Sequence, residues 1–397
     1  MRIVIVGAGV AGCIMARSLS RLPGVEAICL ERVAQGDHAE SGTGLNIGPN
    51  ARLALQVHDP ALADIITAAG LPWRTWRISL TDGTVLFDLP LSEVAHNDGW
   101  RIRWSELYRV LREAAAPAVS YDCAIADIAR DGASIAWQQG GASRRLDNID
   151  LLIAADGRYS QVRRLLAGEP ASRMVGVAIS RVLVPDSSNG LIDDYEQWFN
   201  GPNRLLAFRV PPDHVYVATA FPIPADQPIP ESLKRPDALR AAFTPRSGHL
   251  SDQSRWLIDT VCANVADVHW ARMQEHDVLY ADPRAPVLYL GDAAHGMVPT
   301  LGQGATQAIE DAAVAAGLIA REWTAGRRDP RAWLSTIEAL RRERMHFTME
   351  FSRDATDTML EGADPVAGTL HKTEAEFMAK LRRLYQEVPG LPAMAKS

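Results

Sequence analysis

Lysine and cysteine are both scarce in this chain of 397 residues. The four cysteines are far apart in the sequence, so no CxxC pair is present and neither a zinc site nor a disulfide framework is predicted. We therefore expect no bound metal and a reducing, cytoplasmic compartment. The only lysines are Lys234, Lys372, Lys380 and Lys396, and none follows a glycine, which excludes a Walker A phosphate loop.

Long apolar runs and a positive net charge are also absent. No stretch approaches the roughly 18 apolar residues that a membrane-spanning helix needs. The 41 Lys and Arg residues against 48 Asp and Glu give a formal net charge of −7, which argues against nucleic acid or an anionic membrane as a partner. No GxSxG or HExxH motif occurs. With 47% hydrophobic and 22% charged residues, the composition is that of a globular protein.

A glycine-rich motif opens the chain. The apolar run Arg2–Val6 predicts a buried parallel strand and leads directly into GAGVAG, with glycines at Gly7, Gly9 and Gly12. A helical stripe follows, and then a second predicted strand that ends at Glu31, about 20 positions past the third glycine. In a dinucleotide-binding βαβ unit these glycines admit a pyrophosphate and the acid accepts hydrogen bonds from a ribose. The pattern alone does not separate NAD from FAD.

Two later segments favour FAD over NAD. One predicted strand ends in Asp156-Gly157, and another leads into GDAAH, which places Asp292 at a strand end where a sugar-like chain needs an acceptor. Gly302 and Gly304 then flank the start of a predicted helix. A helix N-terminus stabilises the negative charge that a reduced flavin carries at its pyrimidine edge, and NAD requires no such second site.

Taken together, these motifs resemble those of the single-component FAD-dependent aromatic hydroxylases, the relatives of 4-hydroxybenzoate, salicylate and 6-hydroxynicotinate monooxygenases. The resemblance spans nearly the whole chain through spaced motifs, and it is specific for the family but not for its substrate. The motifs are GAGVAG with Glu31-Arg32, GTGLNIGPN at residues 42–50, Arg103 in RIRWSEL, ADGRYSQVR, GDAAHGMVPTLGQGATQAIEDA at residues 291–312, and Glu338-x-x-Arg341.

The resemblance implies a role for each matching position. The first glycines would hold the FAD pyrophosphate, Glu31 the adenosine ribose, and Arg103 the phosphate or ribityl region. Asp156-Gly157 is linked in this family both to FAD and to the nicotinamide donor, and Asp292 to the ribityl chain or pyrophosphate. The cofactor-binding residues implied in this way are Gly7, Gly9, Gly12, Glu31, Arg32, Gly44, Asn46, Arg103, Asp156, Gly157, Asp292, Gly302, Gln303 and Gly304.

Pro299 and His295 are the candidate catalytic residues. The resemblance implies that Pro299 lies near the reactive face of the flavin ring. Histidine is a residue type that commonly transfers protons, which makes His295 a candidate, although a lone histidine beside a cofactor loop more often orients or supports its neighbours. Asn46, on the 42–50 loop, is placed to reach either the flavin or a polar group of the substrate.

The order of the predicted elements indicates an α/β fold. We expect a Rossmann-type FAD-binding domain with an interleaved antiparallel-sheet substrate domain and a C-terminal helical segment. β hairpins are predicted at residues 78–89, where Asp82-Gly83 is a strong turn signal, and also at 205–221 and 131–146. The expected boundaries are 1–72, 99–169 and 276–328 for the FAD-binding domain, 73–98 and 170–275 for the substrate domain, and 329–397 for the helical segment.

Aromatic residues on the predicted strands of the second domain are the candidate substrate contacts. Some should face a flat ligand across the flavin, although aromatics on a sheet also simply pack against one another. Arg181 and Arg209 are candidates to pair with a substrate carboxylate, although exposed arginines are the commoner case. The substrate residues predicted are Trp198, Phe208, Tyr216, Phe221 and Arg181.

The function that the resemblance implies is hydroxylation of an activated aromatic or N-heteroaromatic ring, phenolic or carboxylated, through a flavin C4a-hydroperoxide. FAD would be the bound cofactor and NADH or NADPH a transient electron donor. O2 and a small aromatic molecule would be the substrates of a monomer or homodimer. The sequence identifies neither the base that activates the substrate nor which of NADH and NADPH is the electron donor. Three alternatives remain: a same-fold epoxidase or reductase acting on a non-aromatic substrate, an NAD-dependent dehydrogenase, and a non-catalytic protein that uses FAD structurally.

Overall fold

The computed structural model describes residues 1–37 and 43–391. It begins with the βαβ unit predicted from the glycine motif: β1 (Arg2–Val6), α1 (Val10–Leu19) and β2 (Glu26–Leu30). Strand β1 is the centre of a five-stranded sheet whose neighbouring pairs are all parallel, which makes the fold mixed α/β with a parallel sheet. The order across this sheet is β18 (Val287–Tyr289), β12 (Leu151–Ala154), β1, β2 and β8 (Val119–Ser120).

A seven-stranded sheet forms the other large layer. Its neighbouring strands are antiparallel except for β5 and β14, which are parallel, so the expectation of a wholly antiparallel sheet is wrong at this pair. These two strands lie more than a hundred residues apart in the chain, and a long connection allows either direction where a tight turn would not. The order is β17 (His269–His276), β13 (Ser172–Pro185), β16 (His214–Pro222), β15 (Asn203–Val210), β14 (Tyr195–Asn200), β5 (Thr75–Leu80) and β6 (Val85–Pro90).

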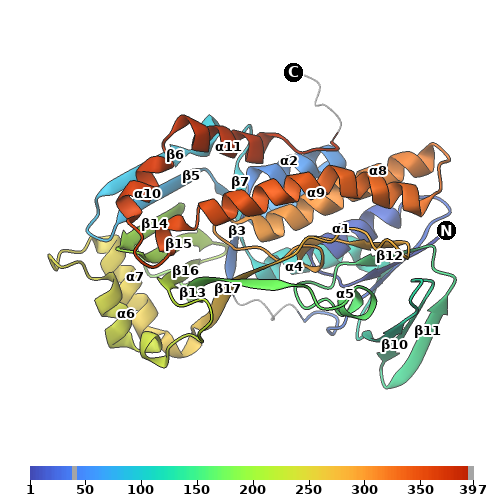
Figure 1. Cartoon of the computed structure of the whole chain (residues 1–397), viewed down its shortest axis with the longest axis horizontal. Helices are drawn as coiled ribbons and strands as arrows, with labels where there is room; N and C mark the ends of the chain where they lie inside the picture. Colours follow the sequence, from blue (N-terminus) through green and yellow to red (C-terminus); the bar gives the residue numbers. More distant parts are fainter. Residues whose placement is uncertain (38–42, 392–397) are drawn as a thin grey trace.

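The three predicted hairpins are confirmed. They are the antiparallel pairs β5–β6, β15–β16 and β10–β11. The last pair belongs to a small separate sheet of β11 (Ala142–Asp147), β10 (Ser134–Gln139) and β9 (Ala124–Ile128), which projects beside the parallel sheet (Figure 1). Another small sheet joins β3 (Gly44–Ile47), β7 (Gly99–Arg103) and β4 (Leu71–Trp73).

Two long helices run side by side across the molecule (Figure 1). They are α8 (Gln303–Thr324) and α9 (Pro330–Asp354), so the helical periodicity predicted after residue 329 is confirmed. Helix α8 also packs on α1 and α2. The remaining α-helices are α2 (Pro49–His58), α3 (Pro60–Ala69), α4 (Trp104–Ala115), α5 (Gln161–Leu166), α6 (Pro236–Phe243), α7 (Asp252–Ala263), α10 (Pro365–His371) and α11 (Ala375–Gln386).

The seven-stranded sheet has a core on each face. One face packs against α6 and α7, and the other packs in part against α9 and α11. Because successive side chains of a strand point to opposite faces, each strand contributes to both layers. The second face also forms one wall of the cavity described below.

In the described residues no helix is both long and apolar enough to cross a membrane. The same ranges hold no group of three or more His, Cys, Asp or Glu side chains that could bind a metal ion.

Candidate functional site

The glycine turn after β1 brings backbone segments into close contact. Gly7 has a φ of +96°, which favours glycine, and a Cβ there would lie 2.5 Å from the carbonyl oxygen of Ala155. A Cβ on Gly12 would overlap the carbonyl oxygen of Gly7, so α1 packs against this turn only with glycine at that position. For Gly9, the nearest atom to a Cβ would be 3.8 Å away, and this residue lines a cavity.

Two helices begin at this cavity with uncapped N-termini. Helix α1 follows Gly9, and α8 follows Gly302, which has a left-handed φ of +65°. Neither helix has a side chain that caps its first N–H groups, and neither has an acidic residue in its first turn. The first N–H groups of a helix lack intrahelical acceptors, so both ends present donors and partial positive charge to a ligand.

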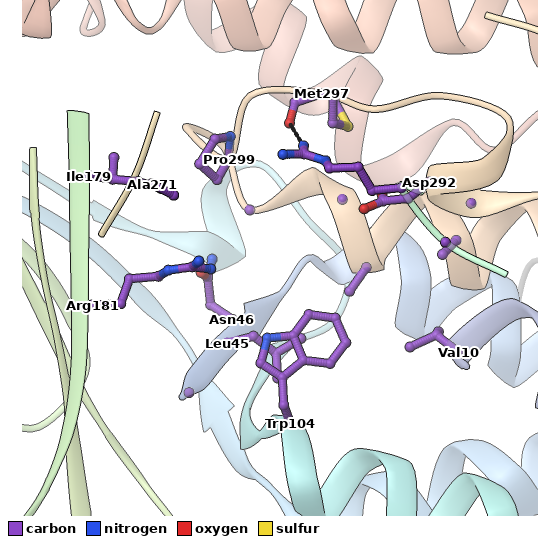
Figure 2. A pocket seen from close by; sticks show the side chains of 18 of the residues that line it. Val10, Leu45, Asn46, Trp104, Ile179, Arg181, Ala271, Asp292, Met297 and Pro299 are labelled. Carbon is purple, nitrogen blue, oxygen red and sulfur yellow. Dashed lines mark hydrogen bonds between the residues drawn. The ribbon is translucent and has the colours of Figure 1, made fainter. Parts of the chain in front are cut away.

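The cavity has a volume of about 430 Å³ and reaches from the start of α1 to the seven-stranded sheet. Figure 2 shows Val10 on one side and Ile179 and Arg181 on the other, with Trp104 and Pro299 between them. Its size is that of a small-molecule site. The predicted site residues that line it are Gly9, Gly44, Asn46, Gly157, Arg181, Tyr216, Asp292, Pro299, Gly302 and Gly304.

Glu31 is buried at the end of β2 and held in place by the backbone. Its carboxylate accepts hydrogen bonds from the N–H groups of Ala8 (2.5 Å) and Val33 (3.1 Å). A guanidinium nitrogen of Arg112, a residue that the sequence patterns did not single out, lies 3.8 Å from the same carboxylate. Arg32 is exposed beside it. The acid of the nucleotide motif therefore sits in a fixed geometry next to the glycine turn.

Arg103 ends β7 and carries a buried donor. Among residues 1–37 and 43–391, its enclosed Nε atom has no hydrogen-bond partner. On the sheet Arg103 pairs with Gly44, which lines the cavity. Gly42, the first residue of the GTGLNIGPN motif, lies outside the described residues.

The Asp156 side chain caps a helix and does not line the cavity. Its carboxylate accepts hydrogen bonds from the Ser160 hydroxyl (2.6 Å) and from the N–H groups of Gln161 (2.7 Å) and Val162 (3.1 Å). Burial raises the pKa of Asp156 above its usual value. Of the Asp-Gly pair only Gly157 lines the cavity, so a side-chain contact of Asp156 with a ligand there is not supported.

The loop after β18 carries Asp292 and Pro299 into the cavity (Figure 2). His295, between them, has no exposed surface and does not line the cavity. Its Nε2 atom lies 2.7 Å from Oδ2 of Asp311, which also accepts a hydrogen bond from the N–H of Gly291. The structure therefore contradicts a direct proton-transfer role for His295. The side chain is buried outside the cavity, and its contact with Asp311 holds the loop in place.

The Gln303 side chain also turns away from the cavity. Its Oε1 atom accepts hydrogen bonds from Asn50 (3.1 Å) and Gln307 (3.0 Å), so only the backbone of Gln303 belongs to the helix start. Asn46 is packed against Gly302, where a Cβ would lie 2.5 Å from the Asn46 Nδ2 atom. Glycine at position 302 thus allows both the left-handed turn and the close approach of β3.

Side-chain alternation on the seven-stranded sheet separates the predicted substrate residues. Tyr216 lines the cavity, and Phe208 packs against it with ring centroids 4.9 Å apart. Trp198 and Phe221 lie in the core on the opposite face, against α6 and α7. Their prediction as substrate contacts is wrong, because Phe221 is an odd number of positions from Tyr216 on the same strand. Arg209 is half-buried and pairs with Asp186, outside the cavity lining.

Arg204 and Tyr195 line the cavity but were missed by the sequence patterns. Both are buried, and the Tyr195 hydroxyl oxygen accepts a hydrogen bond from Gln197. Burial raises the pKa of Tyr216 to about 12, so its phenol stays protonated at neutral pH. The signal that could have found Arg204 is its even spacing from Phe208 on one strand, which places both on the same face.

The cavity offers several of the features that FAD requires. It holds uncapped helix starts at α1 and α8. Arg103, whose Nε has no partner in the described part of the chain, pairs on the small sheet with Gly44 of the cavity lining. At the start of α8, a Cβ on Gly304 would meet no atom within 4 Å, which leaves room for a flat ring. An elongated, anionic dinucleotide needs donors and free space in this arrangement.

No family model matches the chain. The chain is 30% identical over 380 residues to the 3-amino-4-hydroxybenzoate 2-monooxygenase PtnB3 of Streptomyces platensis, covering 89% of this chain and 87% of that protein. It is 26% identical over 375 residues to the 6-hydroxynicotinate 3-monooxygenase of Pseudomonas fluorescens, covering 89% and 91%. Among solved structures, HpxO of Klebsiella pneumoniae complexed with FAD and uric acid has a TM-score of 0.78 at 21% identity, covering 97% and 96%. The chain therefore belongs to the family of FAD-dependent aromatic monooxygenases.

Proposed function

We propose that this monooxygenase binds FAD between the two helix starts and hydroxylates an electron-rich aromatic or heteroaromatic ring held against the seven-stranded sheet. NADH or NADPH is the electron donor and O2 the oxidant. The observation that supports this proposal is the single cavity that joins the start of α1, the start of α8 and the sheet. The relatives named above act on rings that carry hydroxyl, amino or carboxyl groups.

The proposal includes a division of the chain into domains. Residues 1–72, 99–169 and 276–328 form the FAD-binding domain, 73–98 and 170–275 the substrate domain, and 329–397 a C-terminal helical segment. The positions of the strands support this division. The strands of the parallel sheet fall in the FAD-binding domain, and those of the seven-stranded sheet fall in the substrate domain to within one residue.

The residues of the first domain hold the cofactor at several points. The N–H groups after Gly9 bind the pyrophosphate and Glu31 the ribose, with Arg103 and Asp292 along the chain between adenosine and flavin. The start of α8 at Gly302 meets the pyrimidine edge of the ring. Each assignment uses a donor or acceptor whose position is given above, and the roles agree with the charge of the groups they meet.

Bound FAD supplies the hydride acceptance and the activation of O2. The protein orients the ring substrate beside Pro299 and excludes water, and both requirements are met by the buried wall of β13, β15 and β16. Tyr216 donates a hydrogen bond to the substrate. It does not act as the base, because burial raises its pKa to about 12.

The test is to purify the protein, supply FAD and follow NADH and NADPH oxidation with a panel of hydroxylated benzoates, hydroxypyridines and aminophenols. We expect flavin uptake, oxidation stimulated by some ring compounds, and one atom of labelled O2 in a hydroxylated ring. An epoxide or a reduced non-aromatic product would favour the alternative enzyme of the same fold. Protein that takes up no FAD contradicts the proposal outright.

A further inference from the structure

Two methionines, Met273 and Met297, line the cavity. Both are almost completely buried, and the sulfur of methionine is soft and polarisable. A thioether accepts an oxygen atom at its sulfur without first losing a proton, and the product is methionine sulfoxide. The part of the lining that the structure describes holds no cysteine and no histidine. Within that part, the thioethers are therefore the softest nucleophiles.

The Met273 side chain lies on the cavity face of the edge strand β17. It follows Ala271 by two positions, and side chains two positions apart share a face of the strand. Figure 2 shows Ala271 at the same end of the cavity as Pro299. Met273 also belongs to the same apolar cluster as Val298 and Leu301, which come just before and two residues after Pro299. The thioether thus lies on the wall where the proposed function places the ring substrate.

Met297 is placed differently. Its carbonyl oxygen accepts a hydrogen bond from Arg158 (3.4 Å), and its side chain belongs to a separate apolar cluster that contains Met345 and Met349. Neither of these two methionines belongs to the described lining of the cavity. The chain therefore offers buried methionines both at the cavity wall and in the core, which allows position to be compared at similar burial.

Tyr216 is another oxidisable side chain in the cavity lining. A phenol becomes a strong nucleophile when it ionises. Burial raises the pKa of Tyr216 to about 12, so its ring carries a neutral hydroxyl at neutral pH. The thioether of Met273 needs no such ionisation, which makes it the better acceptor of an electrophilic oxygen atom.

We propose that Met273 is a second oxygen acceptor of this enzyme and is converted to its sulfoxide when the protein turns over with no ring compound in the cavity. NAD(P)H, one proton, O2 and the thioether give NAD(P)⁺, water and the sulfoxide. The O–O bond breaks and an S–O bond forms. The sulfur supplies two electrons and NAD(P)H the other two, which reduce the second oxygen atom to water. The inference rests on the proposed function, which supplies FAD, the donor and O2.

Oxidation of Met273 changes the wall against which the ring binds. A sulfoxide is polar, whereas the neighbouring wall holds the apolar side chains of Ile179, Leu206 and Ala218. Turnover without a ring compound therefore lowers the affinity of the enzyme for its ring substrate.

The first test maps the methionines after turnover without a ring compound. The FAD-loaded protein receives NADH or NADPH, labelled O2, and catalase to remove peroxide released to solvent, and is then digested for peptide mass spectrometry. We expect at least about tenfold more label on Met273 than on Met345, which is similarly buried but lies outside the described lining. Label on Met273 that does not exceed the label on Met345 overturns the proposal.

Peroxide from solvent should give a different pattern. Hydrogen peroxide added to the FAD-loaded protein without a donor should oxidise the half-buried Met174 and Met378 before Met273, because exposure then decides the order. If turnover with NAD(P)H reproduces this order, the oxidant reaches methionine from solvent and the proposal is wrong.

Met273→Leu removes the acceptor and nearly conserves its volume. After turnover without a ring compound, the wild type should bind a ring ligand about tenfold more weakly than before, as followed by the flavin spectrum. Met273→Leu should bind the ligand equally well before and after. The matched control is Met297→Leu, which should lose affinity as the wild type does. No loss in the wild type overturns the effect on ring binding, and equal loss in all three proteins overturns Met273 as the acceptor.

A ring compound separates this inference from the proposed function. A ring that is hydroxylated should keep Met273 unlabelled, because it covers the wall and consumes the oxygen atom. Protein that hydroxylates a ring but never labels Met273 in its absence contradicts only this inference. Protein that labels Met273 but hydroxylates no ring of the panel contradicts only the ring substrate of the proposed function.

Discussion

His295 and Asp311 form a completely buried pair in which Nε2 lies 2.7 Å from Oδ2. The other carboxylate oxygen, Oδ1, accepts hydrogen bonds from the Tyr280 hydroxyl (2.9 Å) and from Nε of Arg341 (2.8 Å). One carboxylate therefore ties the loop that carries Asp292 to both long helices. Such a buried hydrogen-bonded network fixes geometry, because loss of any one partner leaves a buried polar group without its hydrogen bond.

The first prediction concerns His295→Gln. We expect this variant to bind FAD about tenfold more weakly, since a buried hydrogen bond to a charged group is lost or lengthened. The FAD-saturated variant should keep the shape of its pH–rate profile, because His295 does not line the cavity. Flavin titration and steady-state kinetics measure both effects. Normal FAD affinity together with the loss of one ionisation from the profile would restore the proton-transfer role.

The second prediction concerns stability in acid. Burial alone would raise the pKa of Glu310, but the charges of Arg344 and Arg341 outweigh it and hold the pKa at about 2. For Asp311, burial is outweighed in the same way by His295 and Arg341, and the pKa is again about 2. Unfolded carboxyls titrate near pH 4. The stabilisation is therefore complete above about pH 4.5 and is lost as the pH falls towards 2.

Denaturant titrations at several pH values measure this loss. Each group should contribute a slope of up to about 1.4 kcal/mol per pH unit between its unfolded and folded pKa values. Glu310→Gln should show a shallower slope over this range. Glu343→Gln, an exposed residue of α9, should leave the slope unchanged. Identical slopes in all three proteins would show that Glu310 does not contribute to the loss of stability in acid.

The third prediction separates two kinds of glycine. Gly12→Ala places a methyl group against the Gly7 carbonyl and should lower the stability of the FAD-free protein by roughly 1–3 kcal/mol or more. Gly304→Ala meets no neighbouring atom, so it should leave that stability unchanged or slightly higher and weaken FAD binding instead. Thermal unfolding without FAD and flavin titration distinguish them. The assignment of Gly304 to the flavin edge fails if its variant binds FAD normally.

The fourth prediction uses the two faces of β16. Phe221→Leu should lower stability by about 1 kcal/mol and leave the kinetic constants of the hydroxylation unchanged, because Phe221 lies in the core on the outer face. Tyr216→Phe should fold normally and raise KM for the ring substrate, because Tyr216 lines the cavity and the variant lacks its hydroxyl. A change in KM with Phe221→Leu and none with Tyr216→Phe would reverse the assignment of the faces.

Local signals in the sequence were sufficient for many elements. The strand at Arg2–Val6, the helix after Gly9 and the hairpin at Asp82-Gly83 follow from patterns within a few residues. The observed cap of α5 is equally local, since the Ser160 hydroxyl accepts a hydrogen bond from the N–H of Arg163 within one turn. These features form because short-range sterics and hydrogen bonding decide them.

Features that depend on distant segments could not be predicted in this way. No pattern within a few residues indicates that β5 and β14 pair in parallel. The burial of His295 depends on Asp311, which lies on a helix packed behind the loop. The faces of the sheet could have been predicted. Tyr216 and Phe221 are an odd number of positions apart on one strand, so their side chains cannot share a face. Arg204 could have been found by the same argument, because its even spacing from Phe208 on β15 places both on one face.

The parallel pair of β5 and β14 has a consequence for synthesis of the chain. The hairpin of β5 and β6 emerges from the ribosome about a hundred residues before the strand that it must adjoin. The edge of β5 stays open until then, and unpaired edges invite association with other chains. Slower translation or a chaperone during that interval should therefore influence the yield of this protein more than any late event near its C-terminus.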